Sequence, residues 1–353
     1  MALGAASLPL AGAPAATISA RSMRLNLVNT WTTVMSSSDY RDTLGVTVRS
    51  GGFEGIGEGA PIVRYGESAA QGMEIVKGLE GLFAGADLTQ YAKVLDRVFA
   101  KVDGAWATKA AIDIALYDWV GKKLGVPLWK MWGLDKADAP VTTFSIGIDK
   151  AEVIRRKVRE AAAYPVLKIK VGLSNDEEMI EAVRSETKKP LRVDANEGWK
   201  SVDEAVRKIK WLEKQGVEFI EQPLPASMLA ETGEVRKRVD MPILADECCL
   251  HPEDIPRIAP YFDGINVKVD KAGGLRQAMR MIEMGRALKL KVMCGCMVSS
   301  SLAITAAAQL SPLIDYADLD GNLLIRNDPY EGVRVVDGKL VLPDRPGVGV
   351  VAR

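Results

Sequence analysis

Histidine is almost absent from this chain, and cysteine is scarce. The 353 residues include one histidine and four cysteines. No two cysteines have Cys-x-x-Cys spacing, which argues against a zinc site. Free cysteines are among the most often buried residues, so we expect Cys248, Cys249, Cys294 and Cys296 to be reduced packing residues.

The chain also lacks an excess of charge and a long apolar run. Lysine plus arginine equal aspartate plus glutamate at 46 each, so neither a nucleic-acid partner nor an acidic surface is expected. No stretch reaches the ~20 apolar residues that span a bilayer. Residues 1–19 are small and apolar but have no basic start. They are either a disordered extension of a cytoplasmic protein or the remnant of an export signal, in which case the protein is periplasmic.

Two kinds of pattern divide the rest of the chain. Residues 22–65 alternate as strands do, with a turn signal at residues 50–52, and residues 67–133 read as helices. Strands followed by helices indicate a separate α+β domain, placed at residues 22–138 after an extension at 1–21. Residues 330–353 contain a hairpin with Asp337-Gly338 at its turn, expected to pack back on that domain.

Five ionisable residues recur at nearly even steps between these regions, each at the end of a short apolar run. They are Lys170, Asp194, Glu221, Asp246 and Lys268, separated by 24, 27, 25 and 22 residues. A (β/α)8 barrel spends a comparable length on each strand and return helix, since eight units take ~250 residues. With one run before and two after, the spacing predicts eight strands in a barrel domain at residues 139–329. An open solenoid fits less well, because the pattern stops after about eight units.

The three acids follow one another on strands 3, 4 and 5 of this barrel. Taken singly, Asp194, Glu221 and Asp246 could each cap the helix after its strand. Together they form convergent carboxylates that repel one another unless a cation lies among them. Oxygen ligands without histidine or cysteine favour Mg2+, so we expect one Mg2+ per subunit.

The lysines point to proton transfer. Lys168 and Lys170 lie on the same face of strand 2, and Lys268 closes strand 6, directly opposite. Burial and a nearby cation lower the pKa of a lysine, so Lys170 and Lys268 are expected to act as bases near pH 7. Lys271 is expected at the surface or behind the site. Two bases on opposite faces of a flat enediolate predict racemisation or epimerisation next to a carboxylate, with Lys168 stabilising the developing charge.

The motifs that carry these residues resemble those of the enolase superfamily, in its muconate lactonising subgroup. They run through most of the chain, from about residue 22 to the tail hairpin: Lys168-Ile169-Lys170-Val171-Gly172, Asp194-Ala195-Asn196-Glu197-Gly198-Trp199, Glu221-Gln222-Pro223-Leu224, Ala245-Asp246-Glu247 and Asn266-Val267-Lys268. The resemblance implies a (β/α)7β-type TIM barrel with an N-terminal α+β capping domain. The one histidine, His251, follows strand 5, and none lies near strands 6 or 7. This disfavours the mandelate racemase branch of the superfamily, which uses a histidine base there.

Within that subgroup, Asp318-Leu319-Asp320-Gly321 resembles the Asp-x-Asp with which dipeptide epimerases hold the substrate's α-ammonium. The resemblance therefore implies a dipeptide epimerase, by default of the L-Ala-D/L-Glu type, which acts on murein-peptide fragments. It also implies that Ser145 and Lys168 contact the substrate carboxylate, that Met297 lines the pocket, and that the protein is a homo-oligomer.

Several alternatives stay open. An N-acylamino acid racemase or o-succinylbenzoate synthase would use the same metal and lysines, and a non-catalytic binding protein would need neither. Many relatives carry glutamate where this chain has Ser299. The loop of residues 31–41 has no arginine before Arg41. Either Arg41 or Arg64 could then pair with a glutamate side chain, while Trp31 and Met35 would suit a more apolar residue.

Overall fold

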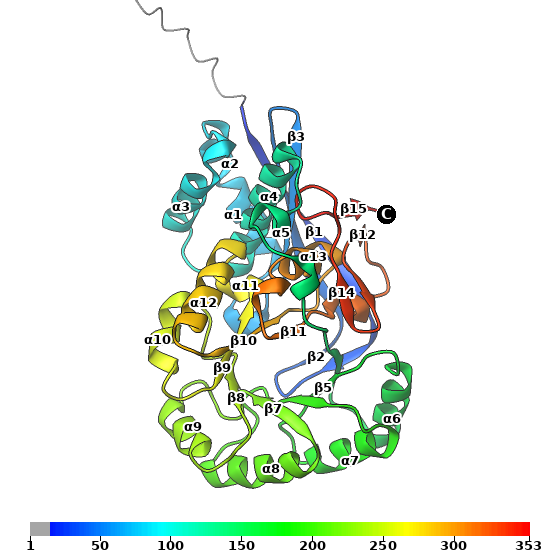
Figure 1. Ribbon diagram of the computed structural model, residues 1–353. Helices are drawn as coiled ribbons and strands as arrows, with labels where there is room; N and C mark the ends of the chain where they lie inside the picture. Colours follow the sequence, from blue (N-terminus) through cyan, green and yellow to red (C-terminus); the bar gives the residue numbers. More distant parts are fainter. Residues whose placement is uncertain (1–14) are drawn as a thin grey trace, which may run out of the picture.

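The computed structural model describes residues 15–353 and has an antiparallel sheet with helices above a barrel of parallel strands (Figure 1). The upper sheet is the expected meander of β1 (Thr17–Thr32), β2 (Ser37–Ser50) and β3 (Phe53–Gly59). Its first strand begins at Thr17, so the boundary placed at residue 22 is wrong. Thr17 pairs with Arg49, and Ile18 is buried in the core, which fixes this early start. The rest of the proposed extension, residues 1–14, lies outside the described residues.

Helices follow this sheet in the chain, and α1, α2 and α4 pack against it. They are η1 (Val63–Tyr65), α1 (Ala69–Lys77), α2 (Glu80–Ala84), η2 (Leu88–Gln90), α3 (Tyr91–Lys101), α4 (Trp106–Leu124), α5 (Leu128–Met131) and η3 (Lys136–Asp138). Almost all of α4 is buried. The alternating glycines of β3 make this possible, since a Cβ at Gly57 would lie 2.1 Å from the carbonyl oxygen of Ala111. Neighbouring Gly55 and Gly59 meet α4 in the same way, so strand and helix pack backbone to backbone.

Eight parallel strands form the barrel, in the order in which they occur in the chain. They are β4 (Phe144–Ile146), β5 (Leu167–Lys170), β6 (Leu191–Asp194), β7 (Val217–Glu221), β8 (Ile243–Ala245), β9 (Gly264–Lys268), β10 (Lys291–Gly295) and β11 (Tyr316–Asp318). A parallel bridge between Thr142 and Ala317 brings the first and last strands together. The expected TIM barrel and its eight strands are confirmed.

Helices return the chain along the outside of the barrel (Figure 1). They are α6 (Ala151–Glu160), α7 (Asp176–Glu186), α8 (Val202–Lys214), α9 (Leu229–Arg236), η4 (Pro252–Asp254), α10 (Ile255–Ile258), α11 (Val269–Ala272), α12 (Leu275–Ala287), α13 (Ser301–Ala308), η5 (Ser311–Leu313) and η6 (Gly321–Leu324). Strands such as β5 and β6 are buried along their whole length, as parallel strands covered on both faces are. Local signals start the helices: the Ser201 hydroxyl accepts a hydrogen bond from the Glu204 amide at the start of α8.

The tail contacts both parts of the molecule. It contains β12 (Tyr330–Glu331), β13 (Arg334–Val336), β14 (Lys339–Val341) and β15 (Val351–Ala352). The hairpin β13–β14 forms, but the expectation that it packs on the first domain is wrong. The carbonyl of Gly338 accepts a hydrogen bond from the Thr142 amide at the barrel, 2.8 Å away. The later segment reaches the first domain instead, where the Val348 amide donates to Asp118 of α4.

The first domain also contributes loops to the mouth of the barrel. The turn between β1 and β2 lies over the end of β4, where the Ile148 amide donates to the carbonyl of Thr32 at 3.0 Å. Helix η1 lies against the loop after β6 through the ion pair of Arg64 and Glu197. Within residues 15–353, the helices are all too short or too polar to cross a membrane.

Candidate active site

The structure places all five evenly spaced residues at the carboxyl ends of barrel strands, as predicted. Lys170, Asp194, Glu221 and Lys268 are the last residues of β5, β6, β7 and β9, and Asp246 comes directly after β8. Their side chains therefore meet at one mouth, the end at which TIM barrels carry their active sites.

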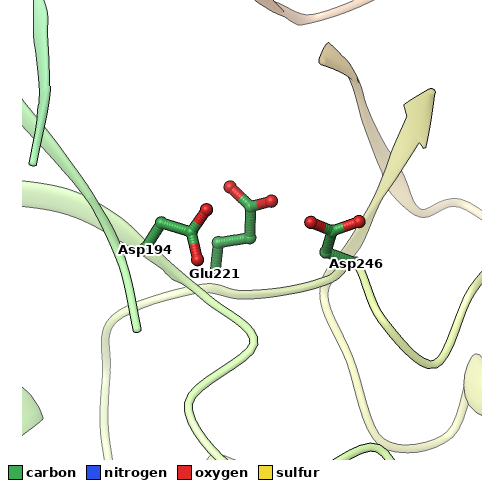
Figure 2. Close-up of side chains that lie close together, drawn as sticks. All are labelled: Asp194, Glu221 and Asp246. Atoms are coloured by element: carbon green, nitrogen blue, oxygen red, sulfur yellow. The ribbon is translucent and has the colours of Figure 1, made fainter. Parts of the chain in front are cut away.

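The three acids form a compact cluster (Figure 2). One carboxylate oxygen each from Asp194, Glu221 and Asp246 lies within 4.8 Å of the others, and all three residues are buried. Burial and the charge of Asp194 raise the pKa of Glu221 to about 7, whereas Lys268 and Lys271 hold the pKa of Asp246 well below its ordinary value. The cluster could hold a metal ion, and its all-oxygen ligands suit a hard one.

Side chains behind the cluster hold the acids in place. The Asn266 amide donates to Glu221 at 2.6 Å, and the Gln222 side chain accepts from the Asp246 backbone amide at 3.0 Å. Lys271 is buried and donates to both the carboxylate and the carbonyl of Asp246. Lys271 was expected either at the surface or behind the site and lies behind it, and no role was predicted for Asn266 or Gln222. The signal that could have found them is their place beside strand ends, since Gln222 directly follows Glu221 and Asn266 lies two residues before Lys268.

The two candidate bases flank the cluster from opposite strands. The Nζ of Lys170 is 2.5 Å from Asp194, and the Nζ of Lys268 is 2.7 Å from Asp246. Burial favours a neutral Lys268, but Asp246 and Glu221 outweigh it and hold its pKa well above the ordinary value. The expectation of a lowered pKa is therefore wrong for Lys268 beside these free carboxylates. Lys268 is therefore held as an ammonium.

Lys168 connects the acidic cluster to the far side of the mouth. Its Nζ lies 2.6 Å from Glu221, 3.2 Å from Asp194 and 2.6 Å from Asp318 of β11. Burial alone would lower its pKa, yet Asp318 and Glu221 raise it well above the ordinary value. Lys168 is thus a fixed positive charge between the acids that could bind a metal and Asp318 of β11.

Asp318 and Asp320 lie together at the end of β11, as predicted, but in unlike surroundings. Asp318 accepts hydrogen bonds from Thr143 and Lys168 at 2.5 and 2.6 Å. Asp320 accepts one from the Ser145 amide at 2.5 Å. Burial and the charge of Asp318 raise the pKa of Asp320 to about 7. Asp320 therefore has the less stabilised carboxylate of the two and the greater need of a cation.

The remaining predicted residues also lie at this mouth. The Ser145 hydroxyl is 3.3 Å from Asp318. Met297 lines a pocket between the two domains together with Tyr65 and Lys271. His251 stacks on Trp106 with ring centroids 3.8 Å apart, just before η4.

Comparison with known proteins agrees with this geometry. Residues 17–133 match the model for the mandelate racemase / muconate lactonizing enzyme N-terminal domain, and residues 151–353 match the enolase C-terminal domain-like model. The L-Ala-D/L-Glu epimerase of Bacteroides thetaiotaomicron is 42% identical over 93% of this chain and 85% of its own. The L-Ala-D/L-amino acid epimerase of Pedosphaera parvula is 38% identical over 93% and 97%.

Solved structures show the same likeness. The dipeptide epimerase of Cytophaga hutchinsonii, solved with Mg and the dipeptide D-Ala-L-Val, superposes with a TM-score of 0.91. The two sequences are 25% identical, and the match covers 97% of this chain and 96% of the other. Both domain models and these relatives show that the chain belongs to the mandelate racemase / muconate lactonizing enzyme family of the enolase superfamily.

Proposed function

We propose that this protein is a Mg2+-dependent dipeptide epimerase, by default of the L-Ala-D/L-Glu type, that inverts the α-carbon of the C-terminal residue. The observation that carries the proposal is the pair of lysines on opposite strands, Lys170 and Lys268, with the acidic cluster between them and Asp318 and Asp320 across the mouth. The relatives described above are named as epimerases of dipeptides of this kind.

Asp194, Glu221 and Asp246 would hold the Mg2+. When bound, the ion supplies positive charge that makes the α-proton of a neighbouring carboxylate substrate more acidic. Lys168, already held between Glu221 and Asp318, binds and orients the same carboxylate with Ser145. Its charge stabilises the negative charge that develops there when the proton leaves.

The two flanking lysines transfer the protons. The neutral amine of one lysine takes the α-proton and becomes an ammonium, leaving a planar enediolate. The ammonium of the other lysine donates a proton to the opposite face and becomes an amine. For the reverse substrate the roles of Lys170 and Lys268 exchange. The net result is inversion of one stereocentre without a redox change.

Asp320, with Asp318 beside it, holds the free α-ammonium of the N-terminal residue. An ammonium group relieves the repulsion that raises the pKa of Asp320. A substrate with a blocked or absent amine offers no such relief. This favours a free dipeptide over the N-acylamino acid that a racemase of the same subgroup would use.

The test is a screen of pooled L,L-dipeptides with the full-length protein and Mg2+ in D2O. Mass spectrometry detects the one-dalton gain that follows exchange of the α-proton. Gain on a subset of dipeptides, with none in EDTA, is expected. Gain on N-acylamino acids but on no dipeptide would move the assignment to the racemase reaction.

A further inference from the structure

The loop that follows Lys170 lies against the next loop of the barrel, backbone to backbone. It runs through residues 171–175, between β5 and α7. Gly172 has a φ of +115°, and a Cβ there would lie 2.5 Å from the carbonyl oxygen of Ala195 and 3.0 Å from the Cα of Gly198. Glycine adopts such a φ readily, whereas other residues rarely do. The chain just after Lys170 therefore has a conformation and a close contact that suit glycine alone.

One buried carboxylate, that of Asp176, fixes this loop. One of its oxygens accepts the backbone amides of Gly172 and Leu173, at 2.7 and 2.9 Å. The other accepts the indole N–H of Trp199 at 2.9 Å and the Nζ of Lys208 at 2.7 Å. An ionised carboxylate has about four acceptor sites, and these donors fill them. Asp176 is 4% exposed, so it is an internal anchor of the loop.

Asp176 ties the position of Lys170 to the loops that follow the acidic strands. The backbone amide directly after Lys170 donates to the carbonyl of Asp194 at 2.9 Å. Trp199 lies in the loop after β6, and its amide donates to the carbonyl of Pro223 after β7 at 3.2 Å. Pairing with β6 holds the chain before Lys170, and Asp176 holds the chain after it. Loss of Asp176 would release the second of these supports and leave the first.

Lys268, the base on the opposite strand, is supported in another way. It ends β9, and α11 begins at the next residue. The amide of Gly273 closes this helix on the carbonyl of Val269 at 3.1 Å. Asp270 of the same helix accepts the Ala60 amide of the first domain at 2.7 Å. A helical turn fixed on the first domain therefore supports Lys268, whereas a loop fixed by one carboxylate supports Lys170.

We propose that Asp176 is a positioning residue for Lys170. By fixing the loop of residues 171–175, it keeps the lysine amine at its face of the α-carbon. A displacement of about 1 Å can slow a reaction that depends on such positioning about 100-fold. The inference rests on the proposed epimerase function and deepens it, since one of the two proton transfers depends on Asp176 and the other does not.

The experiment measures α-proton exchange in D2O at saturating Mg2+, with the L,L- and L,D-forms of a dipeptide that the full-length wild type epimerises. Lys170→Ala identifies the isomer whose exchange depends on Lys170. The measured quantity is the ratio of kcat for that isomer to kcat for the other isomer. Asp176→Ala should lower this ratio at least about tenfold, with KM for both isomers within about twofold, because the groups that bind the substrate are unchanged.

Two variants separate positioning from loss of folding. Asp176→Asn keeps the side-chain volume, and its one carbonyl oxygen can still accept the two loop amides. It should lower the ratio in the same direction by a smaller factor, at least about threefold. Asp263→Ala is the matched control, because Asp263 also accepts a backbone amide, from Ile243 at 3.0 Å, and pairs with Arg236 at 2.8 Å. Asp263 directly precedes β9 at the other end of the barrel, so its loss should leave the ratio within about twofold.

Equal slowing of both isomers in the Asp176 variants would show a role in stability alone and overturn the inference. A fall confined to the isomer that depends on Lys268, or the same fall in Asp263→Ala, would also overturn it while the epimerase function stands. A wild-type protein that exchanges no dipeptide, or a Lys170→Ala variant that keeps full exchange with both isomers, would instead reject the proposed function itself.

Discussion

Asp320 gives the sharpest test of substrate recognition. Its pKa is raised from 3.8 to about 7 by burial and by the neighbouring charge of Asp318, which corresponds to roughly 4 kcal/mol against the charged form. An ammonium beside it recovers part of that cost. A hydrogen bond to a charged group contributes about 1.5–3 kcal/mol, so Asp320→Asn should raise KM for a free dipeptide by about 10- to 150-fold.

The same residue predicts a pH dependence. Below pH 7 Asp320 is protonated and cannot pair with an ammonium, so KM for the dipeptide should fall as the pH rises through about 7. Loss of the substrate's own proton, near the ordinary α-amino pKa of about 8, limits the gain at higher pH. In Asp320→Asn, KM for the dipeptide should no longer depend on pH between about 5.5 and 7.

The assay is initial-rate α-proton exchange at pH 5.5 to 9, with a free dipeptide and with its N-acetylated form. The N-acetyl substrate is the control, since it has no ammonium to lose. A thermal unfolding midpoint of Asp320→Asn no lower than that of the wild type would exclude misfolding. Such a midpoint is expected because the variant replaces a buried carboxylate with a neutral amide. An equal loss on both substrates would refute the ammonium-anchoring role.

Two further results are expected. Asn266→Ala removes the hydrogen bond that orients Glu221 and should weaken Mg2+ binding about 10- to 100-fold by calorimetry, and unchanged affinity would contradict the metal assignment. Gly57→Val forces β3 away from α4 and should cost about 1–3 kcal/mol in urea unfolding. Gly81→Ala, in α2 with open space around it, should leave stability unchanged or raise it by up to about 1 kcal/mol, and a loss equal to that of Gly57→Val would contradict the packing argument.

The strand ends were predictable because each barrel unit repeats one short pattern. An apolar run that ends in a charge marks a buried strand, and the even spacing fixes its neighbours. Lys170, Asp194, Glu221 and Lys268 could therefore be assigned to their strands without coordinates. The opposition of strands 2 and 6 followed from counting alone.

Other features depend on contacts that no local pattern encodes. Arg64 and Glu197 are far apart in the chain and meet only because the first domain sits over the mouth. The strong effect of Asp246 on the pKa of Lys268 required the distance between them. The start of β1 at Thr17 was hidden because the segment before it is also small and apolar.

The central claim is that Lys170 and Lys268 serve opposite faces of one carbon. Its most direct test is α-proton exchange in D2O by Lys170→Ala and Lys268→Ala, with the L,L- and L,D-forms of a dipeptide that the wild type epimerises. Each variant should lose epimerisation, and each should keep exchange with only one isomer, which differs between the two variants. Full epimerisation by either variant, or loss of exchange on the same isomer in both, would contradict the two-base account.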